Sequence, residues 1–249
     1  MRRDEIITGV KNATEPLSYA YALWLEGADA TGYVDEFSDI DFWLDFEDDF
    51  EAQIIKDVED ALGKLAVIDF KYVINHSHPK IRQRIYHLND TSEFLMIDFC
   101  WQLHSREDGV FIQGDKIEAA KVLFDKANVV RYKDYNPTEY KDAKAMRFAE
   151  CKYRFSQHPR IIKYVRRKLY AEAFIYYNRY VIEPLVDALR LIFTPAHVDY
   201  YLVHISRHIP ADKLKQLEYF LVVPTLVDIE RKTKEAKIWF AELAAYLAL

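Results

Sequence analysis

Residues 27–46 read GADATGYVDEFSDIDFWLDF, and the second half of this stretch decides the fold. From Asp39 to Phe46 the even positions are apolar, whereas the odd positions carry three aspartates and Trp43. A period of two is typical of a strand that buries one face. The preceding apolar run, residues 19–26 (YAYALWLE), is a second strand candidate and stops at Gly27. The sequence therefore predicts two strands joined by a connection that begins with glycine.

The composition describes a chain that can fill a core and stay in solution. Its 249 residues suffice for one large domain or two modest ones. Hydrophobic residues make up 51% and charged residues 30%, and only six glycines occur. Such a composition favours helices over a loop-rich β protein. The net charge of −6 disfavours a general nucleic-acid binder but leaves room for a local basic pocket.

The chain shows no sign of export or of a membrane segment. Cys100 and Cys151 lie in no metal-ligand spacing and form no disulfide framework, so we expect reduced thiols. The first residues, MRRDEIITGVKNATEP, lack the apolar core of a signal peptide. No apolar run approaches the length of a membrane span. We therefore expect a cytoplasmic protein without a membrane partner.

The first part of the sequence mixes β-rich runs with helical ones, whereas the second part reads as almost wholly helical. This change predicts two domains, residues 1–135 and 136–249. In the first, further helices are expected at 3–18 and 49–64, and further strands at 66–74, 81–88 and 93–101. In the second, helices are expected at 138–156, 160–192, 196–208, 211–221 and 225–247, with Pro184 dividing or kinking the second of them. The expected fold class is α+β, with a mixed sheet, flanking helices and a C-terminal helical bundle.

Three aspartates are candidates for a metal site. Asp39 and Asp41 share one strand face, with their Cβ atoms roughly 6–7 Å apart, so they can bind one divalent ion or bridge two. Asp98 lies inside an apolar strand, Phe94-Leu-Met-Ile-Asp-Phe99, where an acid without a partner is costly. Carboxylate oxygens are the ligands that Mg²⁺ prefers. Two other interpretations stay open: solvated acids on an outer strand face, and a buried Asp98 held by backbone N–H groups.

The segment Gly27–Phe42 resembles the signature of the polymerase-β-like nucleotidyltransferase superfamily. That signature is Gly-Gly or Gly-Ser, a spacer, and Asp-x-Asp or Asp-x-Glu between hydrophobic residues. The similarity is strongest to bacterial aminoglycoside and lincosamide nucleotidyltransferases, which modify antibiotics. The strand of Asp98 resembles the third carboxylate strand of that family, and the runs at 170–174 and 182–186 resemble its helical domain. The resemblance implies a nucleotidyltransferase-like mixed sheet followed by a helical domain.

The resemblance also implies a reaction: a nucleoside monophosphate passes from an NTP, most simply ATP, to a hydroxyl of a small acceptor, and pyrophosphate leaves. Gly27 and Ala28 would let the backbone approach the triphosphate, and Ser38 would contact phosphate or cap the loop. Asp39, Asp41 and Asp98 would hold Mg²⁺, with two ions per site. Asp98 would also help to activate the acceptor hydroxyl, with Glu150 as the alternative general base.

Two departures from the family pattern lead to further hypotheses. Ala28 stands where the family has Ser or Gly, and the spacer carries acids at positions 29, 35 and 36 but no Arg or Lys. The charge of a triphosphate would then be met from elsewhere, and Lys163 and Arg167, in a basic helical cluster, are the candidates. The alternative for that cluster is a solvated helix face.

Two alternatives to catalysis on a small molecule follow. The first is a catalytically weak or inactive relative that binds a nucleotide or a partner protein, as in regulatory or toxin–antitoxin modules. The second, a nucleic-acid polymerase or tRNA-modifying enzyme, is disfavoured by the net charge. The oligomeric state stays open, although the family can build sites between subunits, so a homodimer is one arrangement that the resemblance implies.

Overall fold

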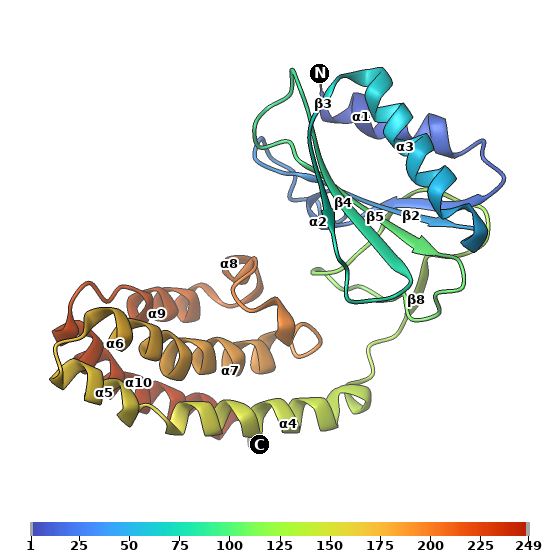
Figure 1. Ribbon diagram of the computed structural model, residues 1–249. Coiled ribbons are helices and arrows are strands. Elements are labelled where there is room, and N and C mark those ends of the chain that lie inside the picture. Colours follow the sequence, from blue (N-terminus) through green and yellow to red (C-terminus); the bar gives the residue numbers. More distant parts are fainter. Residues whose placement is uncertain (1, 248–249) are drawn as a thin grey trace. The chain divides into compact units, whose positions relative to one another are not determined.

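The computed structural model describes residues 2–247 (Figure 1). The chain divides into two compact units, with the boundary between Tyr135 and Asn136. Each unit has its own cluster of buried hydrophobic side chains. Within the described residues, no helix combines the length and the apolar character that crossing a bilayer requires.

A six-stranded sheet forms the centre of the first unit, in the order β3-β4-β5-β2-β1-β7. Its strands are β1 (Ala20–Leu25), β2 (Ile40–Phe46), β3 (Ile68–Ile74), β4 (Ile81–Leu88), β5 (Ile97–Leu103) and β7 (Lys121–Asp125). Strands β2 and β5 run parallel, whereas the other neighbours pair antiparallel. Two short strands, β6 (Val110–Ile112) and β8 (Arg131–Lys133), pair separately. The sheet is mixed, as the sequence predicts.

Helices α1 (Arg3–Thr14) and α3 (Glu51–Leu65) cover one face of this sheet (Figure 1). The alternation in β2 explains why: Ile40, Phe42, Leu44 and Phe46 are fully buried in the same cluster as Ile6 of α1. Helix α3 is amphipathic and contributes Ile54, Val58 and Leu62 to this cluster. The aspartates of β2 consequently lie on the opposite face of the sheet.

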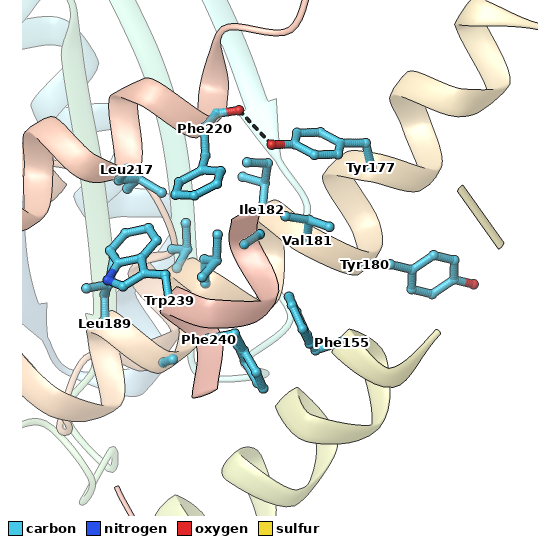
Figure 2. Close-up of a cluster of buried hydrophobic side chains, with 14 of the residues drawn as sticks. Phe155, Tyr177, Tyr180, Val181, Ile182, Leu189, Leu217, Phe220, Trp239 and Phe240 are labelled. Carbon is cyan, nitrogen blue, oxygen red and sulfur yellow. Dashed lines mark hydrogen bonds between the residues drawn. The ribbon is translucent and has the colours of Figure 1, made fainter. Parts of the chain in front are cut away.

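The second unit is helical throughout its core. It contains α4 (Pro137–Ser156), α5 (Pro159–Arg166), α6 (Tyr170–Tyr177), a π-helical turn (Asn178–Ile182), α7 (Glu183–Phe193), α8 (Ile205–His208), α9 (Ala211–Leu221) and α10 (Leu226–Leu247). Figure 2 shows the centre of the bundle, where Phe155 stacks on Phe240 and Phe220 on Trp239, with ring centroids 3.9 and 5.3 Å apart. The hydroxyl of Tyr177 donates to the carbonyl of Phe220 at 2.9 Å. The α+β expectation is confirmed.

Two helix predictions in this unit need correction. The helix expected at 160–192 is interrupted after Arg166, and Lys168 takes a positive φ of 58°, which an α-helix does not allow. Pro184 divides the remainder of this segment as expected: a π-helical turn, Asn178–Ile182, precedes it, and Pro184 occupies the first turn of α7. The helix expected at 196–208 is wrong: the segment contains a short 3-10 helix, Val198–Tyr200, then turns, and only Ile205–His208 is α-helical.

The buried Arg190 explains why residues 196–208 do not form a helix. Its guanidinium donates hydrogen bonds to the carbonyls of Tyr201 and Val203, at 2.8 and 2.6 Å, and contacts Nδ1 of His208 at 2.8 Å. Tyr201 and His204 adopt positive φ angles of 48° and 52°. The carbonyls therefore turn toward one cation instead of toward the N–H groups of a continuing helix.

Replacing this guanidinium is expected to destabilise the protein. In Arg190→Met the partly buried carbonyls of Tyr201 and Val203 lose their charged donor, and a hydrogen bond to a charged group contributes about 1.5–3 kcal/mol. Urea unfolding followed by circular dichroism should show a lower midpoint. Arg160→Met, at an exposed position, is the control and should leave the midpoint within about 0.5 kcal/mol of the wild type. Equal midpoints for both variants would contradict the role given to Arg190.

Candidate functional site

The parallel pairing of β2 and β5 brings two of the predicted carboxylates together. Asp41 lies directly opposite Asp98 in the register of the two strands, which run about 4.8 Å apart. Asp39 immediately precedes β2 and is exposed, whereas Asp41 and Asp98 are half-buried. The charge of Asp39 raises the pKa of both neighbours, so the three groups are close enough to repel one another.

Burial and repulsion strongly favour the protonated form of Asp41. Burial, followed by the charges of Asp39 and Asp98, raises its pKa from 3.8 to about 7, and Arg3 acts in the opposite direction. Burial also raises the pKa of Asp98, but the side-chain amide of Gln83 donates to both of its carboxylate oxygens at 2.9 Å and lowers it. Gln83 thus fixes the orientation of the Asp98 carboxylate.

Gly27 is required where it stands because Asp41 occupies the space of a side chain. Gly27 has a positive φ of 56°, and a Cβ atom there would overlap Oδ2 of Asp41 and come within 3.0 Å of its Cγ. A backbone hydrogen bond also joins the two segments: the N–H of Glu26 donates to the carbonyl of Asp41 at 3.0 Å. Gly27 opens the short helix α2 (Gly27–Thr31), so the connection after β1 packs directly against the carboxylate site.

Two residues near the site carry no signal in the sequence. Glu26 is a fourth carboxylate: burial raises its pKa to about 7, and the indole N–H of Trp24 donates to it at 2.9 Å. Arg3, on α1, donates to the carbonyl of Ser38 at 2.8 Å and contacts Asp29 and the carbonyl of Asp39. Its partners lie 26 to 36 positions along the chain, so only the tertiary fold reveals this cation.

A cavity of about 210 Å³ adjoins Glu26 on the same sheet face. Its walls include the indole rings of Trp24 and Trp43, which stack with centroids 5.9 Å apart, and Arg106, whose guanidinium lies 5.4 Å from the Trp43 ring. Because Trp43 is two positions from Asp41 on β2, the cavity lies next to the carboxylates along the strand. The site therefore combines an acidic end with an aromatic one.

The remaining predicted residues have different surroundings. The hydroxyl of Ser38 donates to the carboxylate of Asp35 at 2.8 Å, so its side chain caps the loop. Ala28 belongs to α2 and its carbonyl accepts from the N–H of Gly32 at 3.0 Å. Lys163, Arg167 and Glu150 belong to the second unit, and their roles stay predictions.

The carboxylates fit a divalent cation by their chemistry. Their oxygens are hard donors, and a cation would relieve the repulsion that raises the pKa of Asp41. In the arrangement described for residues 2–247, no group of three or more His, Cys, Asp or Glu side chains converges closely enough to hold an ion. Asp39, Asp41 and Asp98 lie at the N-terminal ends of β2 and β5, and the carboxylate of Asp98 accepts from Gln83.

Comparisons with known proteins give similar structures only. No family model matches the chain, and no curated protein matches it in sequence. Spectinomycin adenyltransferase AAD(9) from Enterococcus faecialis, crystallised with ATP and spectinomycin, matches with 9% identity, full coverage of both chains and a TM-score of 0.34. JHP933 from Helicobacter pylori matches with 11% identity, 98% coverage of this chain, 95% of the other and a TM-score of 0.31.

A third match is an H. pylori chain described as a proposed nucleotidyltransferase, with 11% identity, 96% and 95% coverage and a TM-score of 0.29. The functional conclusion rests on the residues of the site.

Gly27→Ala is expected to disturb the site through Asp41, because the new methyl group displaces that carboxylate. Gly32→Ala is a matched control, since Gly32 also has a positive φ, of 79°, but no atom within 4 Å of a Cβ. Both variants should lose about 1–2 kcal/mol to the backbone conformation. Chemical unfolding should show an additional loss in Gly27→Ala. Equal losses in the two variants would show that the contact with Asp41 is unimportant.

The pKa of Asp41 predicts a dependence of stability on pH. Since this pKa is about 7 in the folded protein and near 3.8 when unfolded, folding favours the protonated acid, and stability falls as the pH rises from about 4 to about 7. Asp41→Asn removes the ionisation. In EDTA its Tm should exceed that of the wild type by more at pH 8 than at pH 5. Asp49→Asn, at an exposed site, corrects for the loss of one charge. A Tm difference that does not change with pH would contradict the assignment.

Proposed function

We propose that this chain transfers a nucleoside monophosphate from an NTP, with ATP as the expected donor, to a hydroxyl of a small acceptor in a reaction that depends on Mg²⁺. The observation that carries the proposal is the grouping of three aspartates on one face of the sheet. Asp39, Asp41 and Asp98 lie at the adjoining ends of two parallel strands, where burial and the neighbouring charges make ionisation of Asp41 and Asp98 costly. Such an arrangement is typical of a site that is completed by cations.

In the proposed reaction the acceptor oxygen attacks the α-phosphorus of the nucleotide. The bond from that phosphorus to the bridging oxygen breaks, pyrophosphate leaves, and the hydroxyl proton passes to a base. Asp39, Asp41 and Asp98 would hold two Mg²⁺ ions, which supply charge neutralisation at the attacking and leaving oxygens. Gly27 leaves room for the Asp41 carboxylate, because a side chain at position 27 would overlap it.

Asp98 is the base that this arrangement favours. Its raised pKa makes it a better proton acceptor than an ordinary surface aspartate, and the amide of Gln83 holds its carboxylate in one orientation. Glu150, the alternative base, lies on an exposed surface of α4 beside Arg154, 3.6 Å from its guanidinium. Because the Glu150 carboxylate is exposed and already paired with a cation, Asp98 is the stronger candidate.

The aromatic cavity beside the carboxylates supports a small acceptor. Stacked indoles offer a flat apolar wall, and Glu26 offers a hydrogen-bond acceptor at the end that faces Asp41. The volume of about 210 Å³ lies below the range usual for drug-sized ligands and suits one ring of a larger molecule. Hydroxylated antibiotics are the acceptor class to screen first.

A non-catalytic function, binding of a nucleotide or of a partner protein, is favoured by one observation. Arg3, the cation that contacts the loop before β2, is already engaged by Asp29 and by two backbone carbonyls. Together with Ala28, this leaves few groups in the loop for a triphosphate. Titration of ATP with and without Mg²⁺ separates the alternatives, because a catalytic site must bind the nucleotide in a metal-dependent way.

Asp39→Asn is expected to abolish Mg²⁺-dependent release of pyrophosphate from NTPs while the fold persists. Asp39 is exposed, so the substitution leaves no buried group unpaired, and losing one metal ligand should lower the rate by roughly a hundredfold or more. A coupled pyrophosphate assay over NTPs and hydroxylated acceptors measures the rate, and circular dichroism verifies the fold. Asp49→Asn is the control. Wild-type turnover in Asp39→Asn would refute the proposal.

A further inference from the structure

The second unit has its own cavity, of about 590 Å³, between α5 and α10. Five cations line it: Lys163, Arg166, Arg167, Lys234 and Lys237. The remaining wall is formed mainly by His158, Pro159 and Ile162. We call this the basic cavity. All of its lining residues belong to the second unit, and no acidic side chain is among them.

The cations of the basic cavity differ from their neighbours in having few partners. On α10, Arg231 pairs with Asp228 and Glu235, and the ammonium of Lys232 donates to the carbonyls of Tyr219 and Val222. Within residues 2–247, by contrast, Lys163, Arg167 and Lys237 form no ion pair. Lys234 pairs with Glu230 at 2.8 Å, and Arg166 lies near enough to the same carboxylate to help lower its pKa, so one acid serves two of the five cations. Like charges held together without partners destabilise a fold unless an anion joins them.

Helix geometry accounts for only part of this grouping. Lys163, Arg166 and Arg167 lie at the C-terminal end of α5, where the helix dipole stabilises cations. Lys234 and Lys237 lie in the middle of α10, far from either of its ends, and yet they border the same space. The positive field also reaches His158, whose pKa is lowered first by burial and then by Lys237.

The charge balance of the chain follows the same division. Residues 136–249 contain 19 Lys or Arg and 13 Asp or Glu, whereas residues 1–135 contain 15 and 27. The net charge of −6 therefore combines an acidic unit with a basic one. Five cations around one concave surface create a local positive potential on a chain of net negative charge, and such a potential attracts anions.

We propose that the basic cavity binds a compact ligand with two or more adjacent phosphate groups. Two guanidinium forks and three ammonium groups match several phosphates better than one carboxylate, and the arginines can bind phosphate oxygens in pairs. Ile162 and Pro159 add an apolar surface for the carbon part of such a ligand. The volume of about 590 Å³ suits a small molecule, whereas a nucleic-acid backbone would need cations spread along a track. This inference does not depend on the activity proposed for the first unit.

The test is isothermal titration of the full chain with tripolyphosphate, in EDTA and at low salt. Lys163→Glu and Lys237→Glu should each weaken binding at least tenfold, and binding should weaken as salt is added. Lys215→Glu, which makes the same charge change at an exposed position of α9 outside the cavity, should bind like the wild type.

Equal binding by Lys163→Glu, Lys237→Glu and the wild type would overturn the proposal. So would a wild-type chain that binds a single-stranded RNA oligonucleotide but not tripolyphosphate. Because all these positions are exposed, circular dichroism should show the same fold in every variant.

Discussion

The parallel pairing of β2 with β5 is the constraint on which the first unit depends. It sets Asp41 against Asp98 on one face of the sheet, while the opposite faces of the same strands carry fully buried apolar side chains under α1 and α3. Two carboxylates on adjacent strands repel each other, and Asp39 adds a third charge. Two neighbours stabilise the charged carboxylates: Gln83 donates to Asp98, and Arg3 lowers the pKa of Asp41. Gly27 leaves room for the Asp41 carboxylate.

The carboxylates could be predicted because each rests on a local pattern. The alternation in residues 39–46 decides which face of β2 is buried, and Asp98 stands out as an acid within an apolar run. Arg3 and Glu26 could not be predicted, since an arginine in an N-terminal helix and a glutamate after a strand are ordinary until the fold brings them to the site. Site residues can thus be predicted where spacing along a strand places them, and cannot be predicted where tertiary packing brings them to the site.

The second unit shows the same limit in its backbone. The segment 196–208 lies between Pro195 and Pro210 and contains no proline or glycine of its own, so the sequence alone leaves a helix there open. The buried guanidinium of Arg190 competes with backbone N–H groups for the carbonyls of Tyr201 and Val203. A charged donor forms the stronger hydrogen bond, so the carbonyls bond to Arg190. Local propensity gives way when one buried cation would otherwise lie without partners.

Charge also makes metal binding and nucleotide binding depend on each other at the proposed site. A triphosphate that approaches Asp39, Asp41 and Asp98 alone meets like charges, and the nearby Arg3 is already engaged by Asp29. Its entry is therefore favourable only together with cations that neutralise both sides at once. Below pH 7, protonation of Asp41 would remove part of the repulsion and part of the metal affinity together. Nucleotide and metal binding at this site should thus be mutually dependent, and both should weaken as Asp41 takes up its proton.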